Sequence, residues 1–130
     1  MRLVLGVIAG FVVAILCVLA IEALGHSLYP PPAGIDATDP ADQKRLMAVM
    51  PDAAKAFVIA GWFLGALLGG LVANKVARRA LAGWIVAALI VAGGAYSMVA
   101  FPHPMWMIVG GVLLPLVAAW LAQRLAKVPF

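Results

Sequence analysis

The chain has 130 residues, of which 66% are hydrophobic and 11% are charged, and its mean hydropathy is +1.12. An ordinary soluble domain is about half apolar and about a quarter charged, so a water-soluble globule is excluded. The formal net charge of +4 comes from nine Lys and Arg against five Asp and Glu. Because these charges form short groups between apolar runs and no basic patch, the sequence also excludes a nucleic-acid-binding protein.

Four apolar segments of the chain are long enough to cross a membrane. A helix needs about 20 apolar residues to span the roughly 30 Å hydrocarbon core of a bilayer. The segments are long and lack a two-residue alternation, which excludes transmembrane strands. The expected helices cover about residues 3–27, 56–74, 80–101 and 104–123. The sequence therefore predicts an all-α membrane protein, a single four-transmembrane-helix bundle over residues 1–130 with an ordered outer loop.

The first segment also has features of a secretory signal peptide, since Arg2 precedes its apolar run. The run is longer than the usual apolar region of a signal peptide, and no small-residue cleavage site follows it. Cys17 is the single cysteine and lies inside the run, which excludes an intramolecular disulfide and a zinc site built on thiolates. We therefore expect a retained transmembrane helix.

The long connection over residues 28–55 is predicted to be ordered. Prolines end the preceding helix, because proline lacks a backbone N–H group and restricts the residue before it. Asp39 is placed as an N-cap with Pro40 at the first helical position, which predicts a short amphipathic helix as far as Met50. Asp52 is then placed to cap the second transmembrane helix. The apolar side of the short helix, facing lipid or the bundle, comprises Leu46, Met47, Val49 and Met50.

Basic residues predict the orientation of the bundle, since Lys and Arg in short flanks favour the cytoplasmic side. The other side has three Lys and Arg, offset by four Asp. Both termini are therefore expected in the cytoplasm of a bacterium, with the bundle in its inner membrane. Three of the basic residues lie between the second and third helices, where we expect contacts with anionic lipid headgroups: Lys75, Arg78 and Arg79. Tryptophans near the expected helix ends fit an aromatic belt: Trp62, Trp84, Trp106 and Trp120.

Glycines recur every four residues along one face of the second helix. Small residues let helix backbones approach closely in lipid, so this face is predicted to pack against another helix. The partner is either a helix of the same bundle or, in a homodimer, the same helix of a second copy. The predicted packing residues are Gly61, Gly65 and Gly69, with Gly70 beside them.

Glu22 and His26 lie four residues apart near the outer end of the first helix, and therefore on one helix face. Ionisable residues inside transmembrane helices usually face the protein interior and are often functional. His103, in the expected outer turn, lies on the same side of the membrane, and Asp36 is a candidate fourth ligand. Such a cluster is a candidate site for Zn²⁺ or another divalent ion, or for proton transfer. The alternative is structural, with Glu22 and His26 bonded to each other and to the outer loop.

The sequence contains no recognisable catalytic motif. Ser27 and Ser97 lack the context of a nucleophile elbow, and no glycine-rich phosphate loop is present. The first functional hypothesis is an accessory or structural bundle that binds lipid, a membrane partner protein or a second copy of itself. The alternative is a divalent-ion or proton-coupled carrier that uses the outer Glu and His residues. A membrane-embedded enzyme would need the same residues to hold a metal.

The run from Ile21 to Asp36 resembles the opening of a family of small bacterial four-helix inner-membrane proteins, with the pattern Glu-x3-His-x2-Tyr-Pro-x-Pro. The resemblance extends to Pro51, to Trp62 followed by glycines, and to Pro115. A further shared feature is the outer turn Pro102-His103-Pro104-Met105-Trp106. The resemblance implies the four-helix architecture and assigns no activity, ligand or site residue.

Overall fold

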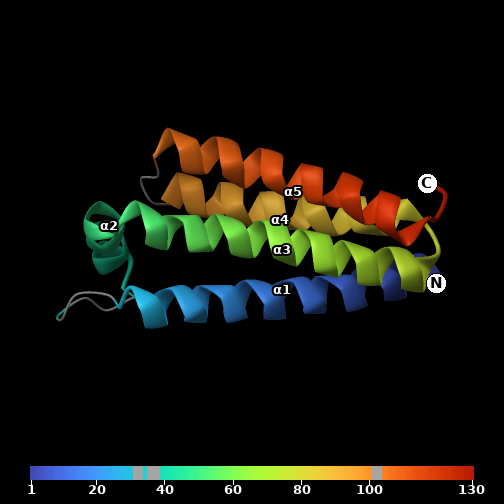
Figure 1. The fold of residues 1–130 in the computed structure, drawn as a ribbon, viewed down its shortest axis with the longest axis horizontal. Helices are drawn as coiled ribbons and strands as arrows, with labels where there is room; N and C mark the ends of the chain where they lie inside the picture. Colours follow the sequence, from blue (N-terminus) through green and yellow to red (C-terminus); the bar gives the residue numbers. More distant parts are fainter. Residues whose placement is uncertain (31–33, 35–38, 101–103) are drawn as a thin grey trace.

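The computed structural model describes residues 1–30, 34, 39–100 and 104–130. The predicted all-α bundle is confirmed, because four of its helices are long and apolar enough to cross a membrane. The helices are α1 (Arg2–Leu28), α2 (Pro40–Val49), α3 (Asp52–Ala77), α4 (Ala80–Ala100) and α5 (Met105–Ala126). Figure 1 shows the long helices side by side, with α2 at one end of the bundle and both chain termini at the other.

Two of the long helices, α3 and α5, extend beyond their apolar segments. α3 begins at Asp52, four residues before the expected start at 56, and α5 ends at Ala126, three residues after the expected end at 123. Each added helical residue forms a backbone hydrogen bond, so a helix continues past its apolar stretch until something stops it. Here α3 begins directly after Pro51, and α5 ends at Lys127, which adopts the left-handed conformation.

The predicted cap of α3 by Asp52 is wrong. Asp52 is the first helical residue, Pro51 occupies the N-cap position, and no side chain among the described residues caps this end with a hydrogen bond. If the Asp52 carboxylate capped the helix, the first helical residue would be residue 53. With the extended Pro51 at the N-cap position, α3 begins one residue earlier. The negative charge of Asp52 nevertheless lies in the first turn, where the helix dipole favours it.

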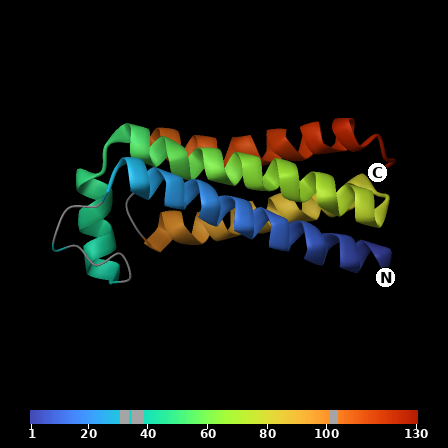
Figure 2. The same cartoon turned by 60° about the horizontal axis from the view of Figure 1, so that its bottom comes forward.

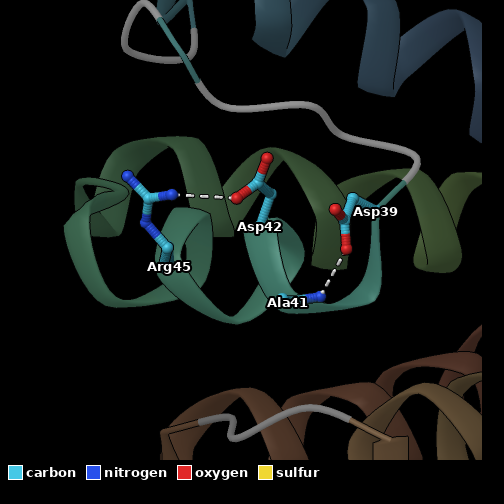
Figure 3. A network of polar contacts seen from close by, with 4 residues as sticks. All are labelled: Asp39, Ala41, Asp42 and Arg45. Carbon is cyan, nitrogen blue, oxygen red and sulfur yellow. Dashed lines mark hydrogen bonds and ion pairs between the residues drawn. The ribbon is translucent and has the colours of Figure 1, made fainter.

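The short helix α2 forms where the sequence predicts it. The Ala41 backbone N–H donates a 2.9 Å hydrogen bond to Oδ1 of Asp39, which is the expected N-cap (Figure 3). One turn along, the Arg45 guanidinium forms an exposed 2.9 Å ion pair with Asp42. Figure 2 shows α2 running across the end of the bundle. Over the described residues, none of the packed helix pairs includes α2.

Helix α3 is the centre of the bundle. It packs against α1 along most of its length and also against α4 and α5, while α4 and α5 pack on each other. The contact between α1 and α4 is smaller, and in the described part of the chain α1 and α5 do not meet. α1 and α4 both run towards the end that carries α2 (Figure 1). As a result, α1 is held mainly through one neighbour and presents a wide face to the surroundings.

Small side chains form most of the core. Alanines supply most of its fully buried apolar positions, and Met107 and Val86 are its largest fully buried apolar side chains. Large apolar residues instead cover the outside, as at Leu16 (62% exposed) and Leu113 (54% exposed). Lipid is as apolar as these side chains, so close backbone packing and not burial of large residues holds helices together in a bilayer.

Candidate functional site

Glu22 and His26 lie one turn apart near the end of α1 that is closest to α2. The Glu22 side chain is half-buried, whereas His26 is exposed. Within the described part of the chain, no hydrogen bond joins the two side chains. The other two candidates of the predicted outer cluster, His103 and Asp36, lie outside the described residues. Over the residues that are described, no three His, Cys, Asp or Glu side chains are placed to hold a metal ion together.

Aromatic contacts hold the end of α1 closest to α2 against α3. The Phe57 ring of α3 lies over Gly25, where an added Cβ atom would come within 2.9 Å of the Phe57 Cβ atom. The same ring meets Tyr29, with the two ring centroids 6.1 Å apart. The Tyr29 backbone N–H closes the helix by donating to the Gly25 carbonyl oxygen at 2.8 Å. These contacts fix the segment that carries Glu22 and His26.

Glu22 lines a groove of about 280 Å³ between α1 and α4. Ser97 of α4 lies at the same end of the groove as Glu22. Trp62 of α3 also lines the groove. The remaining lining is apolar or glycine, and this groove has no Lys or Arg among its described lining residues. The described lining residues are Phe11, Ile15, Val18, Glu22, Trp62, Leu89, Ile90, Gly93, Gly94 and Ser97.

A larger groove of about 1020 Å³ lies between α3 and α5, in the half of the bundle nearest α2. Its described lining residues are all apolar or glycine: Ala56, Ile59, Ala60, Phe63, Met105, Trp106, Val109, Gly110, Leu113 and Leu114. Trp106, at the start of α5, is 42% exposed. Lys55 precedes the first lining residue and lies one turn before Ile59 on the same face of α3. The described part of the groove lining is therefore apolar, and Lys55 and the Trp106 indole lie near the end of the groove that is closest to α2.

Three of the four predicted packing glycines of α3 face α1. A Cβ atom at Gly69 would lie 2.5 Å from the Gly10 carbonyl oxygen, and one at Gly65 would lie 2.9 Å from Cγ2 of Val18. A Cβ atom at Gly61 would lie 3.3 Å from the Cβ atom of Ile21. Gly70 instead faces α5, since a Cβ atom there would lie 3.1 Å from the Cβ atom of Ala122. α1 therefore occupies the glycine face of α3 within the same chain.

Trp62 belongs to the core, so its assignment to an aromatic belt is wrong. Its side chain is only 8% exposed. The ring lies where Gly94 of α4 and Gly111 of α5 have no side chains, since Cβ atoms there would come within 2.8 and 2.6 Å of its Cζ3 atom. The two glycines thus create the space for an indole inside a core of small residues. Sequence position alone could not distinguish this tryptophan from an interfacial one.

The end of the bundle that carries both chain termini contains a polar layer that sequence reasoning missed. Asn74 of α3 is fully buried, and its Oδ1 atom accepts a 2.7 Å hydrogen bond from the Gly83 backbone N–H in the first turn of α4. Its Nδ2 atom has no partner among the described residues. Nearby, the Trp84 indole N–H donates a 2.9 Å hydrogen bond to Oε1 of Gln123. The available signal was that Asn74 is the only asparagine of the chain and lies in an apolar run.

The chain end contributes to the same layer. The Ala80 backbone N–H, at the start of α4, donates a 2.8 Å hydrogen bond to the Pro129 carbonyl oxygen. Nε of Arg79 donates to the Phe130 oxygen at 3.4 Å. A helix start leaves backbone N–H groups unpaired, and here α3 and the chain end supply the acceptors.

The predicted lipid-contacting cations lie at the same end of the bundle as the chain termini. Lys75, Arg78 and Arg79 are all exposed. Arg78 has a φ of 60°, which lets the chain turn from α3 into α4 within two residues. Elsewhere on this end, the Arg124 guanidinium lies 5.0 Å from the centre of the Trp120 ring, a cation–π arrangement.

Comparisons with known proteins add no relative of this chain. No protein-family model, no curated protein and no solved structure matches it.

Proposed function

We propose that the protein is an accessory protein of the bacterial inner membrane that binds a membrane lipid in the groove between α3 and α5. One observation carries this proposal: a groove of about 1020 Å³ whose described lining residues are apolar or glycine, in a bundle with four helices able to cross a membrane. In a bilayer, such a groove is surrounded by the acyl chains of the lipids. An apolar groove of this size lies in the range of specific small-molecule sites.

The polar groups near the groove support a lipid with an anionic headgroup. Lys55 is half-buried and lies near the outer end of the groove, one turn before Ile59. Trp106 lines that end and is partly exposed, which suits the level of the headgroups. A phospholipid with an acyl chain against α3 and α5 would therefore place its phosphate near Lys55.

Packing of α1 on the glycine face of α3 supports a rigid scaffold for this groove. The Gly10 and Gly69 backbones approach too closely for a side chain on either residue. Such approaches strengthen helix association in lipid through van der Waals contact. We infer that the glycine face joins helices within one chain, and that a second copy or partner protein would dock elsewhere.

Charge distribution supports an orientation with both termini in the cytoplasm. The termini share one end of the bundle, and the exposed cations Lys75, Arg78 and Arg79 lie there. Lys and Arg in short flanks favour the cytoplasmic side. A reporter fused after Phe130 that is active only in the cytoplasm should therefore be active, and a reporter active only outside should be silent. The reverse pattern would contradict this orientation.

Lipid binding can be tested by native mass spectrometry of protein extracted in a mild detergent. Ala60→Phe and Gly110→Leu both fill the α3/α5 groove and should reduce co-purified phospholipid several-fold. A Cβ atom at Gly110 has room, with its nearest neighbour at 3.5 Å, so the fold should survive. Leu16→Phe, on an exposed face outside both grooves, is the matched control. Equal phospholipid in all variants, or a protein partner in its place, would overturn the proposal.

The carrier hypothesis is retained as a second candidate because Glu22 is half-buried in a groove of its own. It requires ion or proton flux across proteoliposomes that is lost in Glu22→Gln while the variant stays folded. The accessory function requires no such flux. Metal analysis of the purified protein before and after chelation, with Glu22→Gln and His26→Ala, separates a divalent-ion carrier from a proton carrier.

A further inference from the structure

We infer that the groove between α1 and α4 binds an amphiphile with an ammonium head, in which Glu22 is the counter-ion and the apolar lining receives the hydrocarbon tail. This site is separate from the α3/α5 groove and does not depend on the lipid site proposed there. It rests on three observations: the charge of the groove, the distribution of polar groups along it, and the absence of a hydrogen bond or salt bridge to Glu22 among the described residues.

The charge of the groove selects a cation. Glu22 is its single ionisable lining residue among those described, and none of the described lining residues is Lys or Arg. Glu22 has no hydrogen-bond partner in the described part of the chain, and His26, one turn away, is exposed and does not line the groove. A carboxylate in apolar surroundings is costly unless a positive group pairs with it. A bound ammonium group would supply that partner.

The groove has one polar end and one apolar end. α1 and α4 run in the same direction, so Glu22 and Ser97 both lie towards α2, whereas Phe11 and Leu89 lie deeper in the bundle. Along α1, the lining residues from Phe11 to Glu22 span about 16 Å at the usual rise per residue. An amphiphile in the half of the bilayer nearest α2 has this same polarity. Its head would meet Glu22 and its tail would lie along the two helices.

The aromatic and hydroxyl groups fit the same ligand. Trp62 lines the groove, and an indole is the best aromatic partner for an ammonium group or its adjacent methylenes. The Ser97 hydroxyl is available to accept a hydrogen bond from an ammonium N–H. The volume of about 280 Å³ lies just below the range of drug-sized sites, which suits one alkyl chain and not a two-chain lipid buried whole.

The test uses the full chain in nanodiscs of a diacylglycerol glycolipid, which is neutral and has no ammonium group, and a dodecylamine probe with a photoreactive diazirine on its chain. We expect labelled peptides from α1 and α4, over the lining residues of this groove. Glu22→Gln should reduce labelling at least tenfold. A dodecanol probe with the same chain should label weakly, and its labelling should not change with Glu22→Gln. Equal labelling by both probes, or labelling of wild type and Glu22→Gln alike, would overturn the inference.

A second variant blocks the groove without touching the carboxylate. Gly93 lines the groove, and a Cβ atom there meets nothing within 4 Å, so Gly93→Leu should fold and exclude the tail. Leu16→Phe and Gly110→Leu are controls that should label normally. Circular dichroism and size-exclusion chromatography verify folding of every variant. Normal labelling of a folded Gly93→Leu variant would place the probe elsewhere and contradict the site.

Two sources of the ammonium group are distinguished by competition. If the natural ligand is an aminophospholipid, phosphatidylethanolamine added to the nanodisc should suppress dodecylamine labelling. If it is a free alkylamine, only unlabelled dodecylamine should compete. Failure of both competitors would mean that the labelling is non-specific, and the inference would fall. Because Gly110→Leu blocks only the α3/α5 groove, failure here leaves the lipid proposal there to be decided separately.

Discussion

Gly10 of α1 and Gly69 of α3 approach so closely that neither position has room for a side chain. A Cβ atom on Gly69 would lie 2.5 Å from the Gly10 carbonyl oxygen, and a Cβ atom on Gly10 would collide with the Gly69 carbonyl oxygen. Backbone cannot move aside as a flexible side-chain end can. This contact lies on the interface that holds α1 to its main neighbour.

Gly69→Ala should therefore destabilise the bundle. The added methyl group overpacks the α1–α3 interface, and we expect the free energy of unfolding to fall by about 1–3 kcal/mol. Titration from a mild detergent into sodium dodecyl sulfate, followed by circular dichroism, measures this change. Gly93→Ala is the matched control, because a Cβ atom there meets nothing within 4 Å. A Gly69→Ala variant as stable as the control would refute the packing role of Gly69.

Asn74 should contribute to stability through its buried hydrogen bond to the Gly83 N–H, 2.7 Å long. Asn74→Leu keeps a similar volume but leaves that N–H without an acceptor, so unfolding should become easier by about 1–3 kcal/mol. The same detergent titration measures the loss. Val76→Leu, at an exposed position two residues away, should leave stability unchanged. A stable Asn74→Leu variant would mean that relief of the unpartnered Nδ2 atom offsets the lost bond.

Trp84 and Gln123 should be energetically coupled, since their side chains share a 2.9 Å hydrogen bond between α4 and α5. In a double-mutant cycle with Trp84→Phe and Gln123→Leu, we expect a coupling energy of about 0.5–1.5 kcal/mol. Unfolding of the two single variants and the double variant supplies the numbers. Additive effects, with no coupling energy, would show that the two side chains act independently.

Asp39 should stabilise α2 more than Arg45 does. Removing an N-cap weakens a helix by about 1 kcal/mol, which corresponds to roughly fivefold faster local opening. Asp39→Ala should therefore speed hydrogen exchange of the α2 amides. Arg45→Ala removes an exposed ion pair with Asp42 that salt screens, and its effect should be smaller and vanish at high salt. Equal effects of the two substitutions would contradict the capping role.

Several features of the candidate sites were beyond sequence reasoning. The spacing of Glu22 and His26 placed them on one face of α1, but did not show that only Glu22 lines a groove. That groove exists because α1 packs mainly on α3 and only weakly on α4. Likewise, Trp62 is buried because Gly94 and Gly111, far away in sequence, leave room for its ring. Such steric fits depend on pairs of helices, and one helix does not encode them.

The sequence by itself determined the four transmembrane helices, because 20 apolar residues in lipid must satisfy their backbone hydrogen bonds within each helix. It also determined the start of α2, where the short carboxylate of Asp39 acts on a backbone N–H two residues away. Only the tertiary structure decided which helix meets the glycines of α3, what Asn74 bonds to, and where the two grooves lie. The physical reason is that helix formation and capping depend on residues close together in the sequence, whereas packing depends on which surfaces of distant segments fit together.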